Sequence, residues 1–176
     1  TTPGVKFIDF EAKTLSTWNI PSEYNVLRSM GVFEDSKDNL WIGLSNGIGI
    51  VNPEKTSIKL LKSDPLVQSF NIFDFIETSE GDVLLNSFSP GLSIVSLENE
   101  TVSRIAQDQG FEGAPMDIKL DDDENVWIGS NGYFTIYYPN KSTLKSIETG
   151  LNIWVLGQGP PSVSIFDLEG VYWAGT

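Results

Sequence analysis

The stretch Glu34-Asp35-Ser36-Lys37-Asp38-Asn39-Leu40-Trp41-Ile42-Gly43 decides the fold, because related segments recur along the chain. These segments occupy residues 78–85, 121–129 and 167–175, and the positions equivalent to Trp41 are held by Leu84, Trp127 and Trp173. The four positions are 43, 43 and 46 residues apart. A period of roughly 20 to 50 residues is the signature of a repeat architecture.

Each repeat unit continues in the same way after this position. A turn with Gly leads into an alternating run (residues 48–51, 92–95 and 134–137), and a polar turn then leads into a short strand that opens on Thr (56–58, 101–103 and 143–145). Alternating, β-branched and aromatic residues predict strands, and no apolar stripe at helical spacing is present, so we expect almost no helix. Four short strands in such a unit match a β-propeller blade of about 40–45 residues. We predict an all-β propeller of four four-stranded blades, with the Trp side chains packed between blades.

The two ends of the chain look like halves of one unit. The predicted blades occupy about residues 22–62, 68–107 and 113–149, and the fourth consists of residues 162–176 completed by residues 1–20. In one arrangement the N-terminal strands complete the last blade and close a four-bladed ring, which removes exposed sheet edges. We favour this closure because all four units are accounted for. The alternatives are a part of a larger propeller and an eight-bladed ring made by two chains.

The composition excludes several classes of function. The chain of 176 residues has 24 acidic and 11 basic side chains, a net charge of −13, and lacks both Cys and His. Nucleic-acid binding needs clustered basic residues, so no nucleic-acid partner is expected. Without Cys or His there is no thiolate nucleophile, no disulfide and no His-based triad or zinc site. No run of about 20 apolar residues predicts a membrane helix, so we expect a soluble segment without direct membrane contact.

The repeat resembles the two-component regulator propeller repeat. The shared pattern is an apolar strand, an acidic turn, the residues Asn-Leu-Trp-Ile-Gly and a Gly turn. Residues 34–43 and 121–129 carry it most completely, whereas the second unit has Leu84 and Asn86 where Trp and Gly are expected, and the fourth lacks the Asn. The resemblance covers essentially the whole chain. In that family, two seven-bladed propellers precede a further β-domain, a membrane helix and a histidine kinase.

The resemblance implies a non-enzymatic role for this chain. It would be a periplasmic, soluble part of a membrane-anchored hybrid sensor, detecting an oligosaccharide and signalling to a kinase outside this chain, without a cofactor. The implied partners are the oligosaccharide and neighbouring domains of the same sensor. The alternatives are a structural or protein-interaction scaffold, including a homodimer, and, more remotely, a lyase or hydrolase that uses Asp or Tyr.

The order of strands assigns the loops to two faces of the propeller. Turns between the first and second strands of a blade carry the acidic residues 35–38, 80–82 and 121–124, and we call this side the acidic-turn face. The opposite side, the long-connection face, carries the second-to-third turns and the connections between blades. Sugar rings bind against aromatic side chains with polar groups beside them, so this face is the better candidate, although each aromatic ring there can instead pack onto the blades. The candidate ligand-binding residues are Trp154, Tyr24, Phe70, Phe88, Phe111, Tyr133, Asn46 and Asn131.

Two acidic features have weaker functional interpretations. Residues 121–125 (Asp-Asp-Asp-Glu-Asn) contain oxygen ligands suited to calcium, but they lack the Gly and the distal Glu of a calcium loop. Because every unit has this turn, we predict a solvated turn and no metal site. Asp74 and Asp117 fall at the same repeat position, 43 residues apart, and could line the axial channel. Gly31 holds that position in the first unit, so no ring of carboxylates and no catalytic residue is predicted.

Overall fold

The computed structural model describes residues 4–19, 31–44, 47–61, 72–87, 91–99, 101–113, 115–130, 132–149, 163–166 and 171–175. The strands are β1 (Gly4–Asp9), β2 (Thr14–Asn19), β3 (Val32–Glu34), β4 (Leu40–Leu44), β5 (Gly47–Val51), β6 (Ile58–Leu61), β7 (Ile72–Glu77), β8 (Asp82–Ser87), β9 (Leu92–Ser96), β10 (Thr101–Ile105), β11 (Pro115–Leu120), β12 (Val126–Ser130), β13 (Tyr133–Tyr138), β14 (Thr143–Glu148), β15 (Val163–Phe166) and β16 (Tyr172–Gly175). Helical structure within these ranges is limited to the short 3-10 turns η2 (Gln107–Gln109) and η3 (Pro139–Lys141), as predicted.

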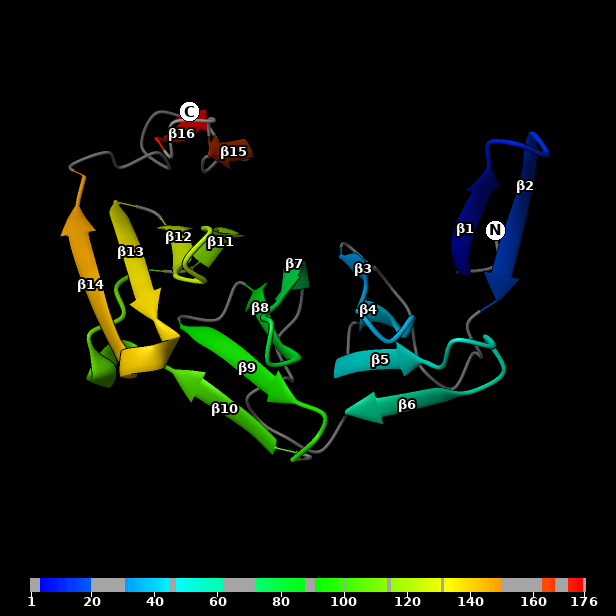
Figure 1. The fold of residues 1–176 in the computed structure, drawn as a ribbon, viewed down its shortest axis with the longest axis horizontal. Helices are drawn as coiled ribbons and strands as arrows, with labels where there is room; N and C mark the ends of the chain where they lie inside the picture. Colours follow the sequence, from blue (N-terminus) through cyan, green and yellow to red (C-terminus); the bar gives the residue numbers. More distant parts are fainter. Residues whose placement is uncertain are drawn as a thin grey trace.

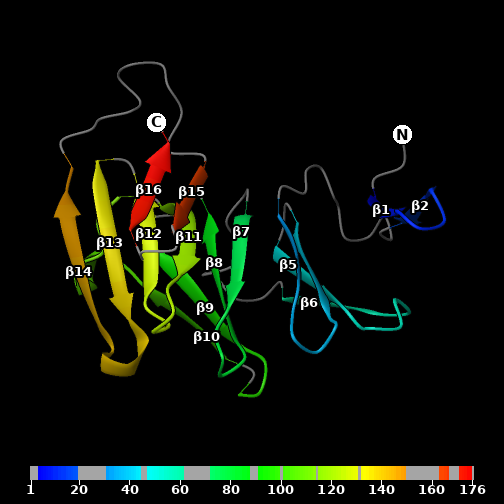
Figure 2. The same ribbon diagram turned by 45° about the horizontal axis from the view of Figure 1, so that its top comes forward.

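Three four-stranded antiparallel sheets form the body of the protein (Figure 1). Their strands follow chain order, β3-β4-β5-β6, β7-β8-β9-β10 and β11-β12-β13-β14, so each is a meander in which every strand pairs with its neighbour in sequence. Figure 2 shows the sheets standing side by side. The chain is all-β and built of propeller-type blades, which confirms the predicted fold class.

Burial follows the position of a strand in its blade. All residues of β4 and β5 are buried, as are all but the first of β8. In the outermost strands β10 and β14 most residues are exposed or half-buried, and Ile105 at the end of β10 is the one buried residue of the two strands. The middle strands need two covered faces, and only stacking against neighbouring blades supplies the second. The hydrophobic clusters accordingly cross from one blade to the next.

Between the first two blades, Trp41, Ile48 and Ile50 pack with Ile72 and Phe75. The ring centroids of Trp41 and Phe75 are 6.2 Å apart, and the Trp41 side chain is fully buried, as predicted for a residue between blades.

The terminal strands form two separate hairpins, β1–β2 and β15–β16. Figure 1 shows them at opposite ends of an open arc. Val5 and Trp18 pack against a cluster of the first blade that includes Ile42 and Val51, and the Trp18 indole donates a hydrogen bond to the Lys55 carbonyl at 3.2 Å. The prediction that the N-terminal strands complete the last blade and close the ring is therefore wrong for the described strands, because the hairpin is held by the first blade and does not pair with β16.

Candidate functional site

Of the eight predicted ligand-binding residues, two are described by the structure. Phe111 is 2% exposed and belongs to the hydrophobic cluster between the second and third blades, so its ring packs in the core. Tyr133 is half-buried at the start of β13. The Ser130 hydroxyl links the two segments, since it donates to the Glu112 carbonyl at 3.0 Å and lies 3.4 Å from the Tyr133 carbonyl. The six others lie outside the described residues: Tyr24, Asn46, Phe70, Phe88, Asn131 and Trp154.

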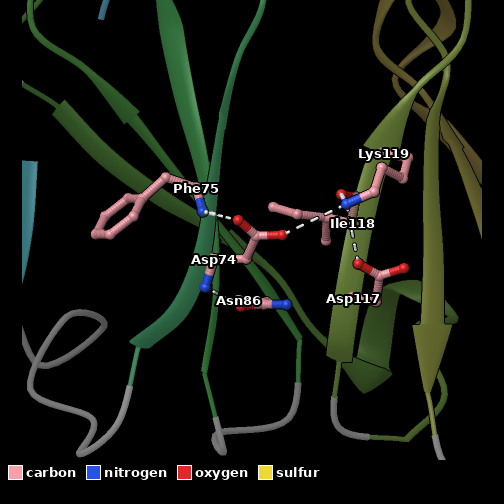
Figure 3. A network of polar contacts seen from close by, with 6 residues as sticks. All are labelled: Asp74, Phe75, Asn86, Asp117, Ile118 and Lys119. Carbon is pink, nitrogen blue, oxygen red and sulfur yellow. Dashed lines mark hydrogen bonds and ion pairs between the residues drawn. The ribbon is translucent and has the colours of Figure 1, made fainter. Parts of the chain in front are cut away.

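Four polar side chains meet between the second and third blades, close to the long-connection face (Figure 3). Asp74 lies near the start of β7, Asn86 near the end of β8, and Asp117 and Lys119 lie on β11. The Lys119 ammonium is 3.1 Å from a carboxylate oxygen of Asp117 and 3.7 Å from one of Asp74. We call these four residues the inner-strand cluster.

A bulge sets the direction of each acidic side chain in the cluster. In β7 the register shifts between Ile72 and Asp74, and in β11 it shifts in the same way between Pro115 and Asp117. A bulge leaves one residue unpaired and turns the next side chain relative to the regular strand. The repeat therefore builds the same irregularity twice, and this brings both carboxylates to the first strands of adjacent blades.

Asn86 stands where the first and third units have Gly43 and Gly129. In the first unit there is little room for a side chain, since a Cβ on Gly43 would lie 3.0 Å from the Cβ of Ile72. In the second unit the Asn86 side-chain oxygen accepts a hydrogen bond from the Asp74 backbone N–H at 2.8 Å. Sequence reasoning noted the departure at Asn86 but assigned it no role. The signal that could have found it is an amide at a position where the repeat has glycine.

The two carboxylates of the cluster differ in their exposure to solvent. Asp117 is nearly enclosed, with 8% of its side chain exposed, whereas Asp74 and Lys119 expose 41% and 36%. Partial burial raises the pKa of Asp74 above its ordinary value of 3.8, and the charge of Asp117 adds to this effect. The Lys119 ammonium and the Phe75 backbone N–H lower the pKa of Asp74 but do not cancel the rise.

The acidic turns hold a different network, which repeats in two blades. The Asp35 carboxylate accepts hydrogen bonds from the backbone N–H groups of Lys37 and Asn39, from the Asn39 amide, and from the Trp41 indole at 2.8 Å. In the third blade the Asp121 carboxylate accepts the same set, with its indole donor Trp127 at 2.7 Å. Within the described ranges, no group of three or more His, Cys, Asp or Glu side chains could hold a metal ion. The sequence prediction of a turn holds, but the role of its first Asp as a hydrogen-bond centre was missed.

These turns predict a stability loss in acid. Burial alone would raise the pKa of Asp35, but the hydrogen bonds from Trp41, Asn39 and Lys37 outweigh it and lower the pKa below 3.8. A carboxyl whose pKa is lower in the folded state contributes stability above its unfolded pKa and loses it as the pH falls through the folded value. We expect the urea midpoint to fall as the pH drops below about 3.8, and Asp35→Asn to flatten this dependence. Parallel pH dependences for the two proteins would contradict the assignment to Asp35.

Glutamates link the acidic turns of the first and second blades to the blade that follows. Glu77 of β7 accepts hydrogen bonds from the Ser36 hydroxyl and backbone N–H at 2.8 and 2.7 Å, and Glu124 accepts the same pair from Ser79 at 2.7 and 3.0 Å. Each glutamate thus joins two blades on the acidic-turn face.

Since the Ser79–Glu124 link is exposed, we expect its contribution to be below about 1 kcal/mol. A double-mutant cycle of Ser79→Ala and Glu124→Ala, measured by urea unfolding, gives the coupling energy. A coupling above about 2 kcal/mol would show that the link is a major stabiliser of the blade interface.

The fold resembles solved extracellular domains of sensors. Over 98% of this chain, the TM-score is 0.78 and the sequence identity 22% to the extracellular domain of a candidate hybrid two-component system, BT3049, from B. thetaiotaomicron. The chain has a propeller fold. For the corresponding domain of BT4673 from the same organism, the TM-score is 0.67 and the identity 21% over 85% of this chain. The chain spans 24% and 22% of the lengths of these two structures.

A third solved structure with this fold is an enzyme. Virginiamycin B lyase from Staphylococcus aureus gives a TM-score of 0.76 at 13% identity, over 98% of this chain and 56% of its own. At such identities the likeness is one of fold. No protein-family model and no curated protein matches the sequence. None of the helical segments in the described ranges has the length and hydropathy needed to cross a membrane.

Proposed function

We propose that this chain is a ligand-sensing segment of an extracellular or periplasmic sensor of the two-component type, that it is not an enzyme, and that its ligand is an oligosaccharide. The observation that carries the proposal is the likeness of nearly the whole chain to the BT3049 extracellular domain. The resemblance of residues 34–43 and 121–129 to the two-component regulator repeat supports it independently. The oligosaccharide follows from that resemblance and from the polar groups close to the long-connection face.

Calorimetric titration of the full chain against neutral and anionic oligosaccharides tests this function. We expect saturable binding of at least one member of a panel that contains xylotriose, mannotriose, maltotriose and an unsaturated chondroitin disaccharide, with no cleavage of the bound sugar. Absence of binding across plant, mucin and glycosaminoglycan oligosaccharides would contradict the ligand. Appearance of shorter or unsaturated products would contradict the non-enzymatic role.

A second candidate function is a protein-interaction scaffold. The β1–β2 hairpin exposes large apolar side chains, with Ile8 at 63%, Phe10 at 85% and Leu15 at 62%. Adjacent exposed apolar residues on one hairpin favour a protein contact, such as a neighbouring domain of the same sensor or a second copy of this chain. Light scattering distinguishes a second copy, since a dimer that Phe10→Ser converts to a monomer would favour the scaffold.

A further inference from the structure

The amide of Asn86 is a buried donor that the fold leaves unused. Asn86 has no exposed surface, and its Nδ2 finds no hydrogen-bond partner among the described residues. Figure 3 shows this nitrogen on the side of the amide away from the Asp74 backbone N–H and toward β11, which carries Asp117. An unmade hydrogen bond of a buried donor costs about 1–3 kcal/mol. Such a group in a folded protein calls for an explanation, and a bound molecule is one.

The repeat does not require an amide at this position. The equivalent residues of the first and third units, Gly43 and Gly129, have no side chain, and their blades form the same four-stranded sheets. The Asn86 side-chain oxygen accepts a hydrogen bond from the Asp74 backbone N–H. In the first unit the two strands are joined at this position by a bond in the opposite direction, from the Gly43 backbone N–H to the Gly31 carbonyl at 3.0 Å. The amide is therefore an addition specific to the second blade, placed beside the inner-strand cluster.

The inner-strand cluster also contains two partly exposed charged groups. The Lys119 ammonium and the Asp74 carboxylate are 3.7 Å apart, beyond good hydrogen-bond distance, and both are accessible to solvent. A polar contact of this length is often bridged by a water molecule. A ligand hydroxyl can replace such a water, because it donates one hydrogen bond and accepts others.

We propose that Asp74, Asn86 and Lys119 bind adjacent hydroxyl groups of a neutral sugar, an inference that rests on the proposed oligosaccharide ligand. Asp74 accepts from one hydroxyl, and Lys119 donates to it or to its neighbour. Because the Asn86 amide has no exposed surface, the blade interface opens slightly on binding to admit the hydroxyl to which its Nδ2 donates. One ammonium stands between two carboxylates, so the cluster has a net negative charge and disfavours sulfated or uronic sugars. The raised pKa of Asp74 agrees with this setting, since a site that is partly shielded from water strengthens hydrogen bonds to hydroxyls.

Nuclear magnetic resonance of the full chain tests the site through the Asn86 side-chain NH2 signal, assigned by its loss in Asn86→Gly. The probes are xylotriose, mannotriose and maltotriose as neutral sugars and the chondroitin disaccharide as an anionic one. We expect one neutral sugar to shift the Asn86 NH2 signal and the anionic sugar to leave it in place. Asn86→Gly and Asp74→Asn should each weaken binding about tenfold, the loss of roughly one hydrogen bond to a charged or buried group.

The matched control is Asn99→Gly, because Asn99 lies at the opposite edge of the same blade, in the turn after β9, and bonds to Ser96 at 3.1 Å. Binding should be unchanged in this variant. Asn86→Gly installs the residue of the other units, so its circular dichroism and thermal midpoint should show a folded protein.

Two outcomes would overturn the site while the oligosaccharide proposal stands. In the first, a sugar shifts signals elsewhere and binds Asn86→Gly as tightly as the unsubstituted chain. In the second, the Asn86 NH2 shows contacts to water only, which means that an ordered water completes its bonding. If no sugar shifts any signal, the oligosaccharide ligand and the site are both wrong.

Discussion

Asp35→Ala should lower the free energy of unfolding by about 3 kcal/mol, because a buried hydrogen-bond centre is lost. Asp35 is 6% exposed and holds the turn before β4 through bonds from Lys37, Asn39 and Trp41. Without the carboxylate, the indole N–H of the fully buried Trp41 side chain has lost its acceptor. A hydrogen bond to a charged group contributes about 1.5–3 kcal/mol, and an unsatisfied buried donor costs about 1–3 kcal/mol. Urea unfolding followed by Trp fluorescence measures the change.

Asp121→Ala is the matched control, since Asp121 accepts the same bonds from Asp123, Asn125 and Trp127. Here Asp121 and Trp127 are both half-buried, so water can replace part of the lost bonding. We expect a loss of about 1–2 kcal/mol. Equal losses for the two variants would mean that the turn geometry, and not the burial of the indole, sets the contribution.

The Asp-to-Trp bond shows what a repeat pattern can and cannot reveal. The spacing of Asp35 and Trp41 recurs in Asp121 and Trp127, so sequence predicted the turn and the inter-blade position of Trp41. The hydrogen bond from the Trp indole to the Asp carboxylate depends on the backbone geometry of the turn, which cannot be inferred from the residue types. Asp38 and Glu124 both adopt φ of +62°, a region that favours glycine, and among the three turns that the structure describes the second has a glycine there, Gly81 at +82°.

Ring closure failed as a prediction for a different physical reason. A period of 43 residues specifies four strands, but it does not specify the angle between blades. That angle arises from side-chain packing at each interface, such as Trp41 against Phe75 in one and Leu84 with Ile118 in the next. The sequence contained both halves of a blade, but in the structure the N-terminal half packs against the first blade through Val5 and Trp18, and β15 lies beside β11 of the third.

The sequence pointed to the long-connection face as the place of a ligand site, but it named none of the inner-strand cluster as ligand-binding residues. Phe111 was predicted to lie in a loop between two blades. In the structure it follows the 3-10 turn η2, and its backbone N–H donates a hydrogen bond to the Ala106 carbonyl at 3.2 Å. This bond turns the chain back, and the Phe111 ring packs in the core. Asp74 and Asp117 were predicted to share a repeat position, and they lie on the first strands of adjacent blades. Their meeting with Lys119 and Asn86 depends on two bulges, which no residue pattern announced.

Gly91→Ala should destabilise the protein by about 3 kcal/mol, because this glycine meets two constraints at once. Gly91 begins the entry into β9 with φ of +101°, where an L side chain is strained. A Cβ at this position would also lie well inside contact distance of the Ile105 carbonyl oxygen on β10, with the Ala106 Cα only 3.2 Å away. Backbone atoms of a paired strand cannot move aside as a flexible side chain can, so the edge of the second blade must shift.

Gly81→Ala separates the two constraints. Gly81 has a similar φ of +82°, but a Cβ there would meet nothing within 4 Å. In this variant backbone strain alone should lower the free energy of unfolding by about 1–2 kcal/mol. The additional loss in Gly91→Ala then measures the clash of the new Cβ with β10. Urea unfolding of both proteins at the same pH gives these values. If Gly91→Ala cost no more than Gly81→Ala, the β9–β10 edge would be able to relax, and the close approach at Gly91 would not contribute to the rigidity of the blade.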